Sequence, residues 1–222
     1  MKTSPTRLLT LLAVLLAGCS SKPLPPDWQT NAHSALKSFS SAYLRGNTRV
    51  AELEFARARS EIASTGRGDL LAHAELVRCA TRVASLEFDN CAGFQAMAQD
   101  ASAGELSYAA YLTGRWQGLD PALLPVQHRA LLTAAATGSD KSLVSSIEDP
   151  LARLVAAGAL LQNGRLTPTD IALATETASA QGWRRPLLAW LGVQARRAQE
   201  AGDRDAAARI EHRIELVSKP LQ

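Results

Sequence analysis

Apolar residues recur along most of this 222-residue chain at the spacing of one helix face. Three stripes that keep this spacing are Ala32-Leu36-Phe39-Tyr43, Leu151-Leu154-Val155-Gly158 and Ala207-Ile210-Ile214-Val217. A period near 3.6 residues predicts amphipathic helices with one buried face. Valine and isoleucine nowhere alternate with polar residues over the length of a strand, so the pattern gives little support for a sheet.

Glycine and proline divide the pattern into segments. Glycines 46, 66/68, 114, 164, 182 and 202 each follow an apolar stripe, the usual place for a left-handed residue that ends a helix. Asp120-Pro121, Asp149-Pro150 and Thr167-Pro168 are typical of a helix cap followed by the first helical residue. We expect about eleven helices, near residues 31–45, 48–64, 69–86, 92–101, 104–113, 121–136, 139–147, 150–163, 168–181, 185–201 and 203–217.

Short links between short helices predict antiparallel neighbours stacked in sequence order, so we expect an all-α domain over residues 31–218. The segment 36–58 resembles a degenerate tetratricopeptide (TPR) hairpin. The residues that carry this resemblance are Leu36, Phe39, Ser40 and Tyr43 in its first helix, and Ala51, Phe55 and Ala58 in its second. Gly202-Asp203 with Ala207 resembles the same turn and second helix. The resemblance implies a TPR-like solenoid with a concave binding face, and an irregular helical bundle is the alternative.

The first 18 residues have the organisation of a secretory signal peptide. Lys2 and Arg7 give a positive start, and an apolar run follows over residues 8–16. That run is shorter than the ~20 residues that a membrane-spanning helix needs. Leu16-Ala17-Gly18-Cys19 resembles the lipobox of bacterial lipoproteins, which implies that Cys19 is acylated and becomes the first residue of the mature chain.

The expected location follows from the same resemblance. Ser20, rather than aspartate, follows the cysteine, which in such lipoproteins implies the outer membrane with the domain facing the periplasm. Retention at the inner membrane remains the alternative. Residues 19–30 are rich in proline and predict an extended tether of roughly 3.1 Å per residue.

Charge excludes one class of partner. The full chain carries a net charge of +3, and removal of Lys2 and Arg7 with the signal peptide leaves +1. Nucleic-acid binding needs a basic patch or stripe, so we expect no nucleic-acid partner.

The two cysteines of the domain, Cys79 and Cys91, are expected to form a disulfide, because export places them in an oxidising compartment. A helix from Cys79 to about residue 87 travels ~12 Å, and four extended residues cover ~13 Å on the way back. Two free buried cysteines are the alternative. A metal site is less favoured, because no histidine or second cysteine pair lies at ligand spacing.

No catalytic motif is complete, so we predict no enzyme, no cofactor and no small-molecule ligand. The four histidines form no zinc-binding or nucleophile-activating motif. Trp183, Arg184 and Arg185 are the candidate partner-binding residues, because tryptophan and arginine are enriched at binding hot spots. Packing of Trp183 in the core and solvation of the arginines is the alternative.

Together these patterns predict a lipid-anchored interaction or scaffold protein of the bacterial cell envelope. Its partner would be an envelope protein or peptide. A cell-wall-active enzyme and a purely structural spacer are the alternatives.

Overall fold

The computed structural model describes residues 24–136 and 143–219, and within these ranges the chain forms ten α-helices and three short 3₁₀ turns without a strand. The α-helices are α2 (Asp27–Leu44), α3 (Thr48–Ala63), α4 (Gly68–Val83), α5 (Ala92–Gln95), α6 (Ala103–Leu112), α7 (Val126–Ala136), α8 (Pro150–Gln162), α9 (Pro168–Ala180), α10 (Arg184–Glu200) and α11 (Arg204–Ser218). The 3₁₀ turns are η2 (Ala98–Asp100), η3 (Pro121–Leu123) and η4 (Val144–Ser146). The predicted all-α class is confirmed for these residues.

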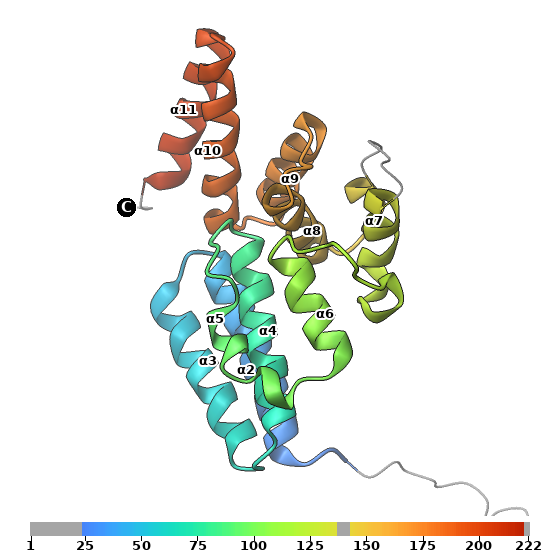
Figure 1. Ribbon diagram of the computed structural model, residues 1–222. Coiled ribbons are helices and arrows are strands. Elements are labelled where there is room, and N and C mark those ends of the chain that lie inside the picture. The colour runs from blue at the N-terminus through green and yellow to red at the C-terminus, as the bar shows by residue number, and fades with distance from the viewer. Residues whose placement is uncertain (1–23, 137–142, 220–222) are drawn as a thin grey trace, which may run out of the picture.

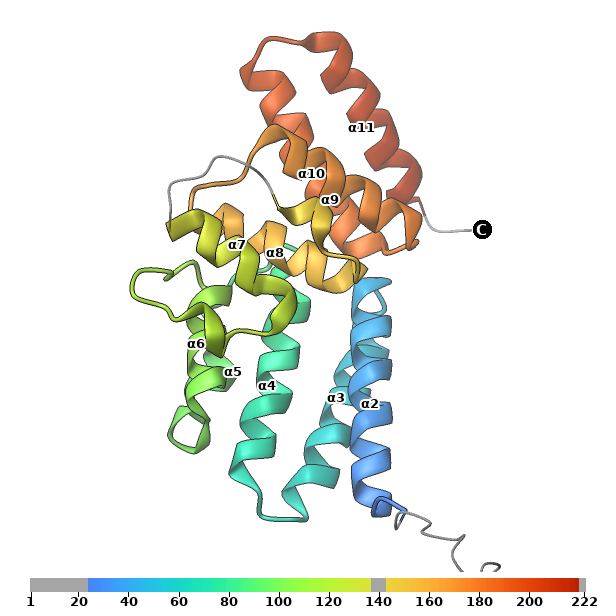
Figure 2. The same cartoon turned by 90° about the vertical axis from the view of Figure 1, so that its right-hand side faces the viewer.

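The helices form two groups that meet at the middle of the molecule. Helices α2, α3, α4 and α6 lie side by side in one half, and α8 to α11 lie in the other (Figure 1). Helices α10 and α11 run antiparallel and project away from the end at which α2 begins (Figure 2). None of the helices in the described ranges combines the length and the apolar character needed to span a membrane.

Side-chain caps start α8, α9 and α11, and the predicted cap Asp120 starts the 3₁₀ turn η3 by accepting from the Ala122 backbone N–H. Asp149 Oδ1 accepts a hydrogen bond from the Ala152 backbone N–H at 2.7 Å and starts α8. Thr167 and Asp170 form a reciprocal capping box at the start of α9. Asp203 caps α11 in the same way as Asp149 caps α8. These starts were predictable because a cap is a contact between residues two or three positions apart.

Six of the glycines expected at helix ends adopt positive φ angles, between 62° and 85°, whereas Gly68 is the first residue of α4. This backbone conformation is strained for residues that carry a side chain. The predicted helix ends at these positions are therefore confirmed.

The predicted bounds are wrong at both ends of the first group. Helix α2 begins at Asp27 rather than near residue 31, so Trp28 belongs to its first turn and residues 27–30 are helical rather than extended. Helix α4 ends at Val83 rather than near residue 86. The chain leaves its axis there, and Leu86 takes a left-handed φ of 58°.

The predicted helices of the middle segment are mostly interrupted. The one expected over 92–101 is a single turn, α5, followed by the 3₁₀ turn η2. The one expected over 121–136 is split at Pro125, which disfavours helical geometry in the residue before it, and Leu124 is extended. Of the helix expected over 139–147, residues 139–142 lie outside the described ranges, and the described part holds only η4.

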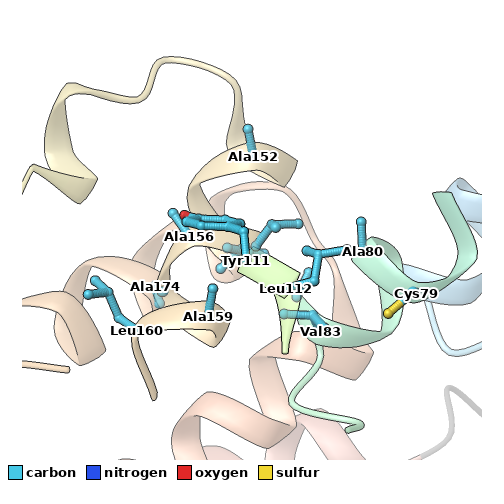
Figure 3. Packing of buried hydrophobic residues seen from close by; sticks show 14 of the residues in the cluster. Cys79, Ala80, Val83, Tyr111, Leu112, Ala152, Ala156, Ala159, Leu160 and Ala174 are labelled. Carbon is cyan, nitrogen blue, oxygen red and sulfur yellow. The ribbon is translucent and has the colours of Figure 1, made fainter. Parts of the chain in front are cut away.

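One large core joins the two groups, and small side chains bring its helices together. Ala156 and Ala159 of α8 lie beside Tyr111 of α6, close to Leu112 and the buried end of α4 (Figure 3). A second, smaller core fills the space between α2, α3 and α4. It contains the rings of Phe39 and Phe55, whose centroids lie 5.0 Å apart. The second core gives the α2–α3 hairpin its own packing.

The expected disulfide joins Cys79 to Cys91, with the two Cα atoms 5.2 Å apart. Both cysteines are buried, and α5 begins directly after Cys91. The bond closes a loop of 12 residues, which in the chain-entropy account contributes at most about 3 kcal/mol to stability. It fixes the irregular segment that leads from α4 into the middle of the molecule.

Candidate functional site

A pocket of about 560 Å³ lies between α4, α6, the η3–α7 segment and the start of α8. Its walls are mainly apolar and include Leu76, Ala80, Tyr108, Leu124 and Val155. Two large apolar side chains of the same segment remain exposed: Leu123 lines the pocket and is 42% exposed, and Val126 follows the lining residue Pro125 in the sequence and is 75% exposed. The break at Pro125 forms this wall, because it turns the chain from η3 into α7.

His128 is fully buried and forms part of the pocket wall. Its ring centroid lies 5.7 Å from that of Tyr108, in a stacked arrangement, and 4.9 Å from that of Tyr111. Trp116 stacks on Tyr111 and donates its indole N–H to the Tyr111 carbonyl at 2.8 Å. This aromatic stack holds the imidazole in one orientation.

The two nitrogens of His128 have different surroundings. Nδ1 lies 3.3 Å from the Tyr111 hydroxyl, whereas Nε2 is buried and has no hydrogen-bond partner in the described part of the chain. Burial lowers the pKa of His128 to about 4, although the nearby Asp149 carboxylate opposes the shift. The imidazole is therefore neutral at pH 7. Burial also raises the pKa of Tyr108 and of Tyr111, so both stay protonated.

Two carboxylates belong to the pocket lining, Glu105 and Asp149. Glu105 Oε2 accepts hydrogen bonds from the backbone and hydroxyl of Ser102, and Oε1 lies 3.4 Å from His73 Nδ1. Asp149 is exposed and uses Oδ1 to cap α8. No lysine or arginine is among the residues that line the pocket, so the two carboxylates are the only acidic or basic side chains of the lining apart from its histidines.

Sequence reasoning did not find this pocket. It treated the histidines as scattered, and it predicted no small-molecule ligand. The local signals were Pro125, which breaks a helix, and the pair Tyr108 and Tyr111 at a spacing of three on one helix. Neither signal shows that α6 and α7 bring these rings against His128, because that contact is tertiary.

The predicted partner-binding residues lie at the start of α10, and the structure gives them different environments. Trp183 precedes the helix and is partly buried against the main core. Arg184 is exposed and donates one hydrogen bond to the Ser218 carbonyl at 2.9 Å. Whether they bind a partner stays a prediction.

Arg185 connects α10 to the first group of helices. Its Nε donates to the Tyr43 carbonyl at 2.8 Å, Nη1 to Glu87 Oε1 at 2.9 Å, and Nη2 to Thr48 Oγ1 at 2.6 Å. The guanidinium also lies 4.2 Å from the centre of the Tyr43 ring. Burial and the hydrogen bond from the Tyr43 hydroxyl to Glu87 raise the pKa of Tyr43. Arg185 is thus engaged within the chain.

We expect Arg185→Ala to lower the free energy of unfolding by about 1–3 kcal/mol, because it leaves the half-buried Glu87 without its closest cation. Arg184→Ala is the matched control, since it removes one exposed hydrogen bond and should cost under about 0.5 kcal/mol. Urea unfolding followed by circular dichroism measures both. Equal effects of the two substitutions would contradict the structural role of Arg185.

The other predicted site residues have separate outcomes. Cys19 lies outside the described residues, and Cys79 and Cys91 are joined as expected. Among the described residues, no group of three or more His, Cys, Asp or Glu side chains is placed to hold a metal ion.

The chain matches no family model, no curated protein and no solved structure. What the site can do therefore follows from its own residues.

Proposed function

We propose that the chain is a lipid-anchored binding protein of the bacterial cell envelope. The pattern of residues 2–19 supports an acyl anchor at Cys19. The Cys79–Cys91 disulfide supports export, because such bonds persist in oxidising compartments. Ser20 supports the outer membrane as the site of anchoring, with the helical domain facing the periplasm.

We also propose that the two ends of the domain are repeat-like hairpins. In the first, Phe39 packs on Phe55, and Ala51 and Ala58 are completely buried. This burial supports the resemblance to a TPR hairpin, whose small residues let two helices approach closely. Helices α10 and α11 form the second hairpin (Figure 1). Between the hairpins the irregular segment from α5 to α7 interrupts the repeat.

The pocket is the observation that carries the binding role. Its volume of about 560 Å³ falls within the ~300–1,000 Å³ typical of binding pockets. Its mainly apolar wall holds a few polar groups, the composition expected of a site that binds an apolar group in a set orientation. Leu123, which lines the pocket, and Val126, three residues further on, leave apolar surface exposed that a partner would cover. We propose that an envelope partner docks here.

Anchoring is tested by replacing Cys19. We expect Cys19→Ala to move the protein from the membrane fraction to the soluble or precursor fraction. In the unsubstituted protein, two or three acyl chains would hold it at the membrane, because each buried CH₂ contributes ~0.8 kcal/mol. Cell fractionation and mass spectrometry of the mature N-terminus measure this. A membrane-bound variant, or a mature chain that starts elsewhere, would refute the anchor.

Docking is tested by photo-crosslinking in cells. A crosslinking residue at Leu123 should capture a specific envelope partner, whereas one at Leu53, an exposed apolar position on α3, should not. Val77→Trp fills the pocket from α4 and should abolish the Leu123 product. Identical products from both positions, or products unaffected by Val77→Trp, would contradict docking at the pocket and leave the spacer role.

A further inference from the structure

We infer that the pocket selects a basic side chain that its partner presents among apolar residues. This inference rests on the proposed function, because it takes the pocket as the docking site. It adds which chemistry the pocket accepts and which it rejects.

The apolar part of the occupant follows from the walls. Leu76, Ala80 and Val155 offer no hydrogen-bonding side-chain atoms, so a polar chain buried there would lose its water without replacement. Because Leu123 and Val126 are exposed, we expect an occupant that extends beyond the pocket. A partner segment with apolar residues on both sides of the inserted group would cover these two as well.

The charge of the occupant follows from the polar groups. Glu105 and Asp149 line the pocket without a lysine or arginine beside them. The guanidinium groups of Arg129 and Arg153 keep their charge, but they donate to the backbone carbonyls of residues 124 and 147 and are not among the lining residues. The charged side chains of the lining itself are therefore two carboxylates, with His73 beside Glu105, and they favour a cation over an anion in the pocket.

His128 adds a hydrogen-bonding requirement to the charge preference. Its side chain is fully buried, its Nε2 has no partner among the described residues, and leaving such an atom unpaired costs about 1–3 kcal/mol. In the tautomer whose Nδ1–H faces the Tyr111 hydroxyl, Nε2 is an acceptor. Within this inference, an ammonium or guanidinium group that reaches Nε2 from the pocket would supply a donor, and a carboxylate group would not.

Three small probes with the same apolar body test the preference: 4-phenylbutylamine, 4-phenylbutanol and 4-phenylbutanoate. Calorimetric titration of the purified full-length chain should show the amine bound about tenfold more tightly than the acid, with the alcohol between them. Val77→Trp should abolish binding of all three. Equal affinities, tighter binding of the acid, or no binding of any probe with a Kd below about 10 mM would overturn the inference.

Two isosteric substitutions isolate the charge. Asp149→Asn keeps an N-cap residue at α8, and Glu105→Gln keeps the capping box of α6, so the fold is retained. The double variant should bring the affinity for the amine to that for the alcohol. The matched control is Asp205→Asn with Glu215→Gln on α11. It also removes two negative charges, but from a helix that does not line the pocket. An unchanged preference in the pocket variant, or an equal loss in the control, would overturn the inference.

Competition identifies the source of the basic group. 4-Phenylbutylamine should reduce crosslinking of the partner at Leu123, and 4-phenylbutanoate should not. If the amine binds with the expected preference but leaves that crosslink intact, the pocket serves a free amine, and the assignment to a partner side chain is wrong. If the probes behave as expected but no partner is ever captured, the proposed function fails while the chemical preference of the pocket stands.

Discussion

Gly158→Ala is expected to lower the free energy of unfolding by about 3 kcal/mol, although the same change usually stabilises a helix. Gly158 lies in the interior of α8, where α8 crosses the end of α4. A Cβ atom at this position would lie 2.4 Å from the Val83 carbonyl oxygen and 2.9 Å from a methyl carbon of Val83. The oxygen belongs to the backbone, so the two helices would have to move apart.

Gly192→Ala is the matched control for this prediction. Gly192 is an exposed glycine inside α10, and a Cβ there meets no atom within 4 Å. Substitution should therefore gain about 0.5–1 kcal/mol from helix propensity alone. Urea unfolding of both variants measures the difference. If Gly158→Ala stabilises the chain as Gly192→Ala does, the close approach of α4 and α8 is wrong.

Helix termini were predictable because their determinants are local. Asp149 meets its partner three residues away, and Gly114 ends α6 with a positive φ that few other residues adopt. The disulfide was predictable because Cys79 and Cys91 are close in sequence and have no other cysteine partner within the domain. In each case the energetic reason is contained in a short stretch of chain.

The site was not predictable because its parts come from distant stretches. His128 meets Tyr111 across 17 residues, and Arg185 reaches Tyr43 across 142. Before the fold is known, nothing distinguishes Arg185, which connects two groups of helices, from the exposed Arg184 next to it. Sequence reasoning could place both on α10, and only the docking of α10 against α2 separates their roles.

The helices predicted for the middle segment are wrong for a third reason. Tertiary contacts there compete with the local preference for a helix. Residues 92–101 have a composition that permits a helix, but Cys91 takes a left-handed φ of 54° and α5 ends after one turn. Pro125 likewise stops the helix that the apolar pattern favours. The second interruption lies at the pocket, so the irregular stretch around Pro125 forms one wall of the site.

Leu154→Asp is expected to cost more than about 4 kcal/mol, the largest effect of any substitution considered. Leu154 is completely buried in α8 within the main core. The change removes about 1.5–3 kcal/mol of apolar burial and places a carboxyl group where no partner awaits it. Leu154→Met, which keeps volume and apolar character, should cost under about 1.5 kcal/mol and serves as the control.

The pH dependence of Leu154→Asp separates the charge from the lost packing. Burial raises the pKa of the new carboxyl group above its unfolded value of ~3.9, so the folded state binds the extra proton more tightly. The loss of unfolding free energy relative to the unsubstituted chain should therefore grow as the pH rises from ~4 to 7, and shrink on acidification. Leu154→Asn, which has the same shape and no charge, should show a constant deficit. Urea unfolding at both pH values measures the two losses of unfolding free energy. If the losses of Leu154→Asp and Leu154→Asn change with pH in the same way, residue 154 reaches water and the main core is packed differently.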